Sequence, residues 1–356
     1  MTNTSQTKSL ALQDVAIIRP IIIFLLVVLH SFTIYGGSTS WILPEGIRPI
    51  PVYSWMVKLI SGFRIETIAF VAGYVFAYQS FVLGRKYPFG PFLWKKFKRL
   101  IIPCLVFSTI YYFCFNFNPD SFRVGNFVLQ LFSGVGHLWF LPMLFWCFVL
   151  IWLIDTKQII SWWLFALLAV LSMIPIPTQV LGLGRVFHFL FYCYAGYMVF
   201  SKKDWIFNHL LNKKSVVLFW FAYFALVVLY FALIESLVEQ FDANFIAKAI
   251  SSLISHGFKL VYSCIGVMAI YLSVNLYISK RQNFVLPRHI VAASSLCYGV
   301  YVFHQFILEW LYYYLPLPEW LGSYALPWVA CTITLAVSIL FSSLLIKTKV
   351  GKFLIG

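Results

Sequence analysis

The stretch that decides the fold is DVAIIRPIIIFLLVVLHSFTIY, Asp14–Tyr35. It is long enough to cross a bilayer, which takes about 20 apolar residues. Arg19 and His30 interrupt it, and ionisable residues inside a membrane helix usually mark a functional site because they are costly in hydrocarbon. At about 100° and about 1.5 Å per residue, these two side chains share one helix face, roughly 16 Å apart along the axis. We therefore expect one face of this helix to carry a cation near one membrane surface and an imidazole more than halfway across.

The composition extends this prediction to the whole chain. The 356 residues are 62% hydrophobic and only 10% charged, whereas soluble domains are about 25% charged. We predict an all-α, polytopic membrane protein with one membrane domain. The net charge of +15 fits loops that hold basic residues on the cytoplasmic side, so no nucleic-acid partner is expected. The seven cysteines are scattered and form no CxxC pair. We therefore expect them to be packing residues and expect neither a disulfide framework nor a metal site.

Apolar windows predict about ten transmembrane helices. Two of them, 160–175 and 187–200, are short enough to be re-entrant or tilted. The remaining ranges are 15–35, 55–83, 97–117, 138–154, 215–235, 257–279, 290–313 and 325–346. Most Lys and Arg residues fall in loops on the side of the N-terminus, which predicts cytoplasmic N- and C-termini. The expected organisation is a cytoplasmic tail at 1–14, a membrane domain at 15–346 and a second cytoplasmic tail at 347–356.

Further polar residues lie in or beside the predicted helices. Arg64 and Glu66 are inside the second helix, and two positions apart they do not share a face. His137 and Trp139 open the fourth helix, and His304 lies in the outer half of the ninth. A lone buried histidine is more often a packing residue, and tryptophan is common at membrane surfaces. Together with the first helix, however, these residues exceed what packing requires and predict a polar cavity that opens outward.

A basic cluster precedes the third helix, formed by Lys95, Lys96, Lys98 and Arg99. Its simplest role is to anchor the helix on the cytoplasmic side. Together with Arg85 and Lys86, however, the segment carries more cations than are needed to orient the helix in the membrane. Such a cluster suits the phosphates of a nucleotide-like ligand or of an anionic membrane lipid. The GxxxxGK[ST] pattern of phosphate-hydrolysing loops is missing.

Five segments, in order along the chain, resemble the membrane-bound acyltransferase-3 family of bacterial O-acyltransferases that modify cell-surface glycans. They are the Arg19-x10-His30 pair, AFVAGYVFAYQS (Ala69–Ser80), KKFKRLIIPCLVF (Lys95–Phe107), GHLWFLPMLF (Gly136–Phe145) and YGVYVFHQFIL (Tyr298–Leu308).

The chain departs from the family pattern at three positions. Pro20 replaces a usual glycine, Ala72 replaces a usual serine, and Lys96 replaces the first arginine of an R-x-x-R motif. Lysine keeps the charge but loses the bidentate fork of arginine. No esterase-like domain follows the last predicted helix, so the resemblance implies the stand-alone membrane form.

The resemblance implies that an acyl group, most often acetyl, moves from cytoplasmic acyl-CoA to a hydroxyl of an extracytoplasmic glycan or lipid-linked sugar. It implies a cytoplasmic (inner) membrane location, acetyl-CoA as donor substrate and no permanently bound cofactor. His30 would be the general base, and Arg19 would serve donor binding or the donor pathway. The basic cluster would bind CoA phosphates. The acceptor or oxyanion residues would be Arg64, Glu66, His137, Trp139 and His304.

Two alternatives remain open from the sequence. The first is a transporter or flippase for a glycan or lipid-linked sugar that uses the buried His, Arg and Glu residues as a proton relay. No internal repeat is evident, whereas many transporters contain one. The second is a basic lipid-interacting scaffold, which leaves the buried histidines unexplained.

Overall fold

The computed structural model describes residues 12–36, 41–85, 87–174, 176–178, 180–236 and 245–356, and all regular elements in these ranges are helical. Eight helical runs are long and apolar enough to cross a membrane. They are Gln13–Tyr35, Pro51–Phe81, Phe89–Asn116, Gly136–Thr156, Lys213–Ile234, Ile246–Ser279, Arg288–Tyr313 and Leu317–Leu345. The prediction of an all-α, polytopic membrane protein is confirmed. Most of the predicted N-terminal tail, including Lys8, lies outside the described residues.

The number of spans differs from the prediction of ten. The predicted helices 160–175 and 187–200 correspond to α9 (Trp162–Ser172) and α10 (Val186–Ser201). Neither has the length of a full span. Helix α10 is instead a core helix that packs against α4 (Arg64–Phe81), α8 (Phe140–Thr156) and α9. A further short helix, α7 (Val124–Ser133), forms between the predicted helices 97–117 and 138–154.

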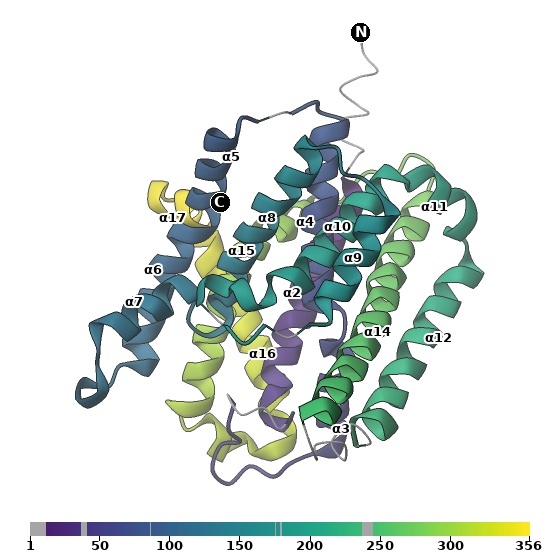
Figure 1. Ribbon diagram of the computed structural model, residues 1–356. Helices are drawn as coiled ribbons and strands as arrows, with labels where there is room; N and C mark the ends of the chain where they lie inside the picture. The colour runs from purple at the N-terminus through teal and green to yellow at the C-terminus, as the bar shows by residue number, and fades with distance from the viewer. Residues whose placement is uncertain (1–11, 37–40, 86, 175, 179, 237–244) are drawn as a thin grey trace.

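Helix α2 (Gln13–Phe32), which carries Arg19 and His30, lies at the centre of the bundle (Figure 1). It packs against α3 (Pro51–Ser61), α4, α14 (Phe245–Ser279), α15 (Arg288–Tyr313) and α16 (Leu317–Leu345). Twelve of its residues are buried, so the helix is a core element and not a peripheral anchor. We name the two ends of the bundle after this span: the Gln13 end and the Tyr35 end.

Close packing of α4 on α10 depends on small residues. Ala69, Gly73 and Ala77 recur every fourth position along α4, and all three are buried. A Cβ atom on Gly73 would lie 1.7 Å from the carbonyl oxygen of Cys193, and one on Gly196 would lie 1.9 Å from that of Phe70. The two backbones therefore touch, as at small-residue interfaces of other membrane helices. This contact fixes the position of Arg64, the first residue of α4.

The third span is irregular where it carries the basic cluster. It consists of α5 (Phe89–Lys96), the π-helical η2 (Phe97–Ile101), α6 (Ile102–Tyr111) and a second π-helical turn, η3 (Tyr112–Asn116). Pro103 has no N–H to give the carbonyl of Arg99 four residues earlier. The hydroxyl of Tyr298 on α15 donates to that carbonyl at 3.2 Å. The irregular turn thereby ties Arg99 to α15.

The other elements are shorter or lie at the edges of the bundle. Helix α17 (Lys349–Ile355), within the predicted C-terminal tail, packs against α6 and η2. The remaining helical elements are η1 (Thr33–Tyr35), η4 (Pro119–Ser121), η5 (Gly136–Trp139), η6 (Val180–Arg185), α11 (Lys203–Leu210), α12 (Lys213–Leu229) and η7 (Tyr230–Ile234).

Candidate active site

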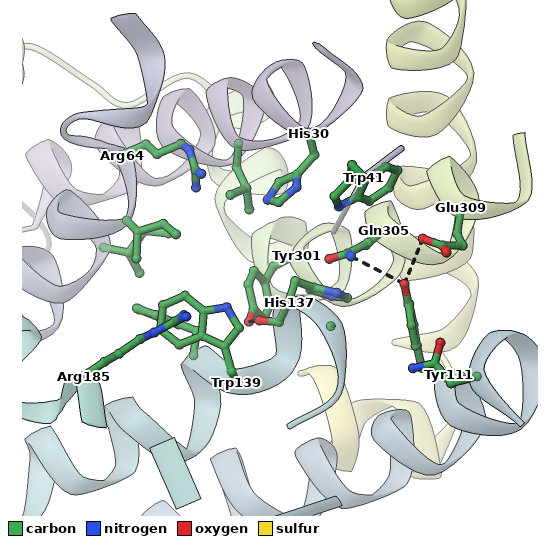
Figure 2. Close-up of a pocket in the computed structure, with 16 residues that line it drawn as sticks. His30, Trp41, Arg64, Tyr111, His137, Trp139, Arg185, Tyr301, Gln305 and Glu309 are labelled. Carbon is green, nitrogen blue, oxygen red and sulfur yellow. Dashed lines mark hydrogen bonds between the residues drawn. The ribbon is translucent and has the colours of Figure 1, made fainter. Parts of the chain in front are cut away.

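A cavity of about 450 Å³ lies beside α2 in the half of the bundle toward the Tyr35 end. Four predicted residues line it: His30, Arg64, His137 and Trp139. They come from α2, α4 and η5, which the fold brings together although they are far apart in the sequence (Figure 2). The predicted polar cavity is therefore present. Its other polar or aromatic lining residues are Trp41, Tyr111, Asn116, Phe140, Arg185, Tyr301, Gln305 and Glu309.

His30 belongs to a cluster of three imidazoles. The ring centroid of His304 lies 5.1 Å from that of His30 and 4.8 Å from that of His137. His304 is fully buried behind the other two and is not a lining residue. Trp41 packs against His30 at 6.4 Å between centroids, and the Tyr312 hydroxyl donates to the carbonyl of the neighbouring Ser31. The position of His30 is thus fixed from several sides.

Backbone carbonyls determine where two of these imidazoles carry their protons. Carbonyls only accept, so Nδ1 of His304 donates to the carbonyl of Tyr301 at 2.7 Å, and Nε2 of His137 donates to that of Val302 at 3.0 Å. In the neutral forms, His304 Nε2 and His137 Nδ1 are then lone-pair acceptors, and both are buried without a partner in the described part of the chain. A neutral His137 consequently has no N–H left to stabilise an oxyanion.

Two arginines line the cavity. Arg64 begins α4 and is only 8% exposed, and its Nε and Nη1 atoms have no partner among the described residues. The guanidinium of Arg185 lies over the Trp139 ring, 4.0 Å from its centroid. Arg185 is exposed, and a guanidinium remains charged in proteins. Together the two side chains make one end of the cavity cationic.

The opposite end contains a carboxylate and neutral polar groups. The Tyr111 hydroxyl donates to Oε2 of Glu309 at 3.0 Å, and Nε2 of Gln305 donates to the Tyr111 oxygen at 3.4 Å. Gly136 lies beside them with φ +57°, a conformation that favours glycine. Figure 2 shows the arginines on one side of the view, the Glu309–Tyr111 pair on the other, and His30 and His137 between them.

Glu66 is not among the cavity residues. Its carboxylate lies 3.8 Å from Nε2 of His188 on α10. It interacts with Arg64 electrostatically, without a short ion pair. The expectation that Arg64 and Glu66 point in different directions is met, and the structure does not bring Glu66 to His30.

The predicted donor-binding residues occupy the other half of the bundle. Arg19 is exposed, and Arg99 of η2 is close enough to act on it electrostatically. Lys96 differs, because its Nζ lies 3.2 Å from the ring centroid of Phe148 and is used in helix packing. Lys95 and Lys98 lie over Tyr87 and Trp94 at 5.0 Å and 5.5 Å. The basic cluster therefore divides, and only Arg99 joins Arg19.

Buried apolar side chains separate this arginine pair from the cavity. Ile23 and Leu26 lie on the α2 face between Arg19 and His30 and are 9% and 2% exposed. A ligand that reached from one site to the other would have to displace such side chains.

Some cavity residues were not predicted as site residues. Arg185 and Glu309 stand alone among apolar neighbours in the sequence, which is a usable signal. Trp41 lies in the segment between the predicted helices 15–35 and 55–83, where an aromatic residue is common near a membrane surface. Tyr111 resembles an ordinary helix residue, whereas Tyr301 and Gln305 belong to the family-like segment Tyr298–Leu308. The packing of α15 against η5 and α6 brings all three to the cavity.

Comparison with protein families gives a match between residues 13–347 and a family model described as an acyltransferase domain. No curated protein and no solved structure matches the chain.

Proposed function

Because the chain belongs to the acyltransferase 3 family, we propose that it is an O-acyltransferase of the cytoplasmic (inner) membrane. It would move an acyl group, most simply acetyl, from cytoplasmic acyl-CoA to a hydroxyl of an extracytoplasmic glycan or lipid-linked sugar. The observation that carries this proposal is the arrangement along α2. An arginine pair lies near the Gln13 end, and an imidazole in a polar cavity lies toward the Tyr35 end.

Arg19 and Arg99 would hold the donor. The two guanidiniums repel each other electrostatically, and neither forms an ion pair in the described part of the chain. Phosphate oxygens would relieve that repulsion and accept charge-assisted hydrogen bonds. CoA carries several phosphates, and its pantetheine arm would pass along the α2 face by displacing Ile23 and Leu26.

His30 would act as the general base. A hydroxyl is a poor nucleophile at neutral pH, and a neutral imidazole takes its proton as the oxygen attacks the thioester carbonyl. The resulting oxyanion would be stabilised by Arg64, whose Nε and Nη1 have no partner among the described residues. Collapse then breaks the carbon–sulfur bond, the ester forms, and the imidazolium returns the proton to the departing thiolate of CoA.

The decisive experiment uses radiolabelled acetyl-CoA and membranes that contain the protein. Label that appears covalently in a surface glycan or lipid-linked sugar supports acyl transfer. Movement of an unmodified sugar without incorporation of label would support the transporter alternative and contradict the proposal. Membranes that contain the His30→Ala variant are the control, since the variant should insert normally and incorporate no label.

A further inference from the structure

The arginine end of the cavity contains a charge that the acyl-transfer chemistry does not use. Arg64 is close enough to His30 to act on it electrostatically, which suits an oxyanion donor. Arg185 is different, because it belongs to η6 and its guanidinium lies over the Trp139 ring, 4.0 Å from the centroid. No described acidic residue forms an ion pair with it or acts on it electrostatically.

The acidic residues near this region are already engaged elsewhere. Glu309 accepts a hydrogen bond from Tyr111 at the far end of the cavity, and Glu66 faces His188. Arg185 is exposed and lines the cavity, so an incoming anion can reach its guanidinium. Its Cζ atom lies over the Trp139 indole, and no described acidic residue pairs with it; a guanidinium in such a position can bind a carboxylate or phosphate in bidentate fashion.

Building on the proposed function, we propose that the acceptor is an acidic sugar whose carboxylate or phosphate binds Arg185 beside Trp139. Its neutral hydroxyls would then point toward Glu309 and Tyr111, and the hydroxyl to be acylated would lie between the two ends, next to His30. The indole of Trp139 would also offer an apolar surface to the sugar ring. The CoA phosphates do not compete for this position, because the proposed donor site, Arg19 of α2 with Arg99 of η2, lies in the half of the bundle toward the Gln13 end.

The test measures binding of three sugars to the purified full-length protein without donor: glucose, glucuronate and glucose 6-phosphate. At least one acidic sugar should bind roughly tenfold more tightly than glucose, which corresponds to one charge-assisted interaction, and the advantage should shrink in high salt. Preference for glucuronate indicates a carboxylate on the acceptor, and preference for glucose 6-phosphate indicates a phosphate.

Three variants separate this role from others. Arg185→Gln should remove the advantage of the acidic sugar, Arg185→Lys should retain part of it, and Arg123→Gln, which changes an exposed arginine outside the cavity, should change nothing. Equal binding of acidic and neutral sugars, or no binding of either acidic sugar by protein that still binds acetyl-CoA, would overturn the inference. An Arg185→Gln variant that binds all three sugars more weakly by the same factor would also overturn the inference. Label transfer from acetyl-CoA tests the proposed function separately, because it can succeed with a neutral acceptor.

Discussion

His30 is the residue on which the proposed chemistry depends most directly. Its Nδ1 is buried and has no partner among the described residues, while the ring lines the cavity. We expect His30→Ala to lower the rate of acyl transfer at least ~100-fold, the usual contribution of a general base. Donor affinity and the melting temperature should change little. Activity measured with labelled acetyl-CoA checks this, with His209→Ala as the control, because His209 is exposed and lies outside the cavity.

A His30→Ala variant with normal transfer would remove His30 as the base. The neighbouring imidazoles would then need a new interpretation. His304 and His137 each donate one N–H to a backbone carbonyl. The other ring nitrogen of each neutral imidazole then has a lone pair that could accept a proton, so these two residues would be substituted next.

Within the basic cluster, Arg99 acts on Arg19 electrostatically whereas the lysines lie over aromatic rings. This difference leads to a second prediction. Arg99→Gln should weaken acetyl-CoA binding roughly tenfold, as the loss of a charge-assisted contact predicts, and should make the remaining binding less sensitive to salt. Lys98→Gln, a matched change one position away, should have a much smaller effect because Lys98 lies over Trp94. Titration of the detergent-purified protein measures both. A larger loss in Lys98→Gln than in Arg99→Gln would contradict the assignment.

Sequence spacing placed Arg19 and His30 on one helix face, because both belong to the same regular helix. It could not separate Lys96 from Arg99, since the π-helical turn at Phe97–Ile101 changes the direction of the side chains. The same limit applies to Arg185. Its stacking on Trp139 depends on tertiary packing between η6 and η5, which no local pattern records.

At the scale of elements, the contact between α4 and α10 positions the cationic end of the cavity. Arg64 begins one helix, and Arg185 directly precedes the other. We expect Gly73→Ala to destabilise the protein by about 1–3 kcal/mol, a usual cost of overpacking, because the added Cβ would lie 1.7 Å from a backbone oxygen. Acyl transfer should fall as well, since separating these helices moves both arginines.

Thermal unfolding of the detergent-purified variants measures this effect. Gly125→Ala is the control, because nothing lies within 4 Å of a Cβ atom there and alanine favours helix. A Gly73→Ala protein that melts like the parent would show that the helices separate at little cost, and the close contact would not then define the site.

The sequence predicted all eight long spans because their apolar runs are long enough to cross a bilayer. It also located α9 and α10, but it did not determine that they are core helices below membrane-spanning length. Whether a short apolar helix crosses a bilayer or packs within a bundle depends on its neighbours, and α10 packs on α4, α8 and α9. Composition alone does not distinguish these outcomes.

For the whole molecule, the proposed mechanism requires the two sites to face opposite sides of the membrane. The basic loops predict that the Gln13 end faces the cytoplasm, so the arginine pair would meet acyl-CoA there and the cavity would face the acceptor. In sealed vesicles with labelled acetyl-CoA outside, we expect transfer only where the Gln13 end is exposed to the medium. Equal transfer by vesicles of both orientations would contradict this arrangement.

Orientation in these vesicles can be assigned independently with single cysteines. Lys280 belongs to the loop at the Gln13 end, where the Phe284 carbonyl accepts a hydrogen bond from Gln13, and Glu319 lies at the Tyr35 end near Ser323, whose carbonyl accepts one from Tyr35. In a background with exposed Cys114 replaced by serine, an impermeant thiol reagent should label Lys280→Cys only in the vesicles that transfer acetyl from outside. Glu319→Cys should be labelled only in the other population. If Lys280→Cys were instead labelled in the inactive vesicles, acetyl-CoA would enter from the Tyr35 end, and the roles assigned to the arginine pair and the cavity would be wrong.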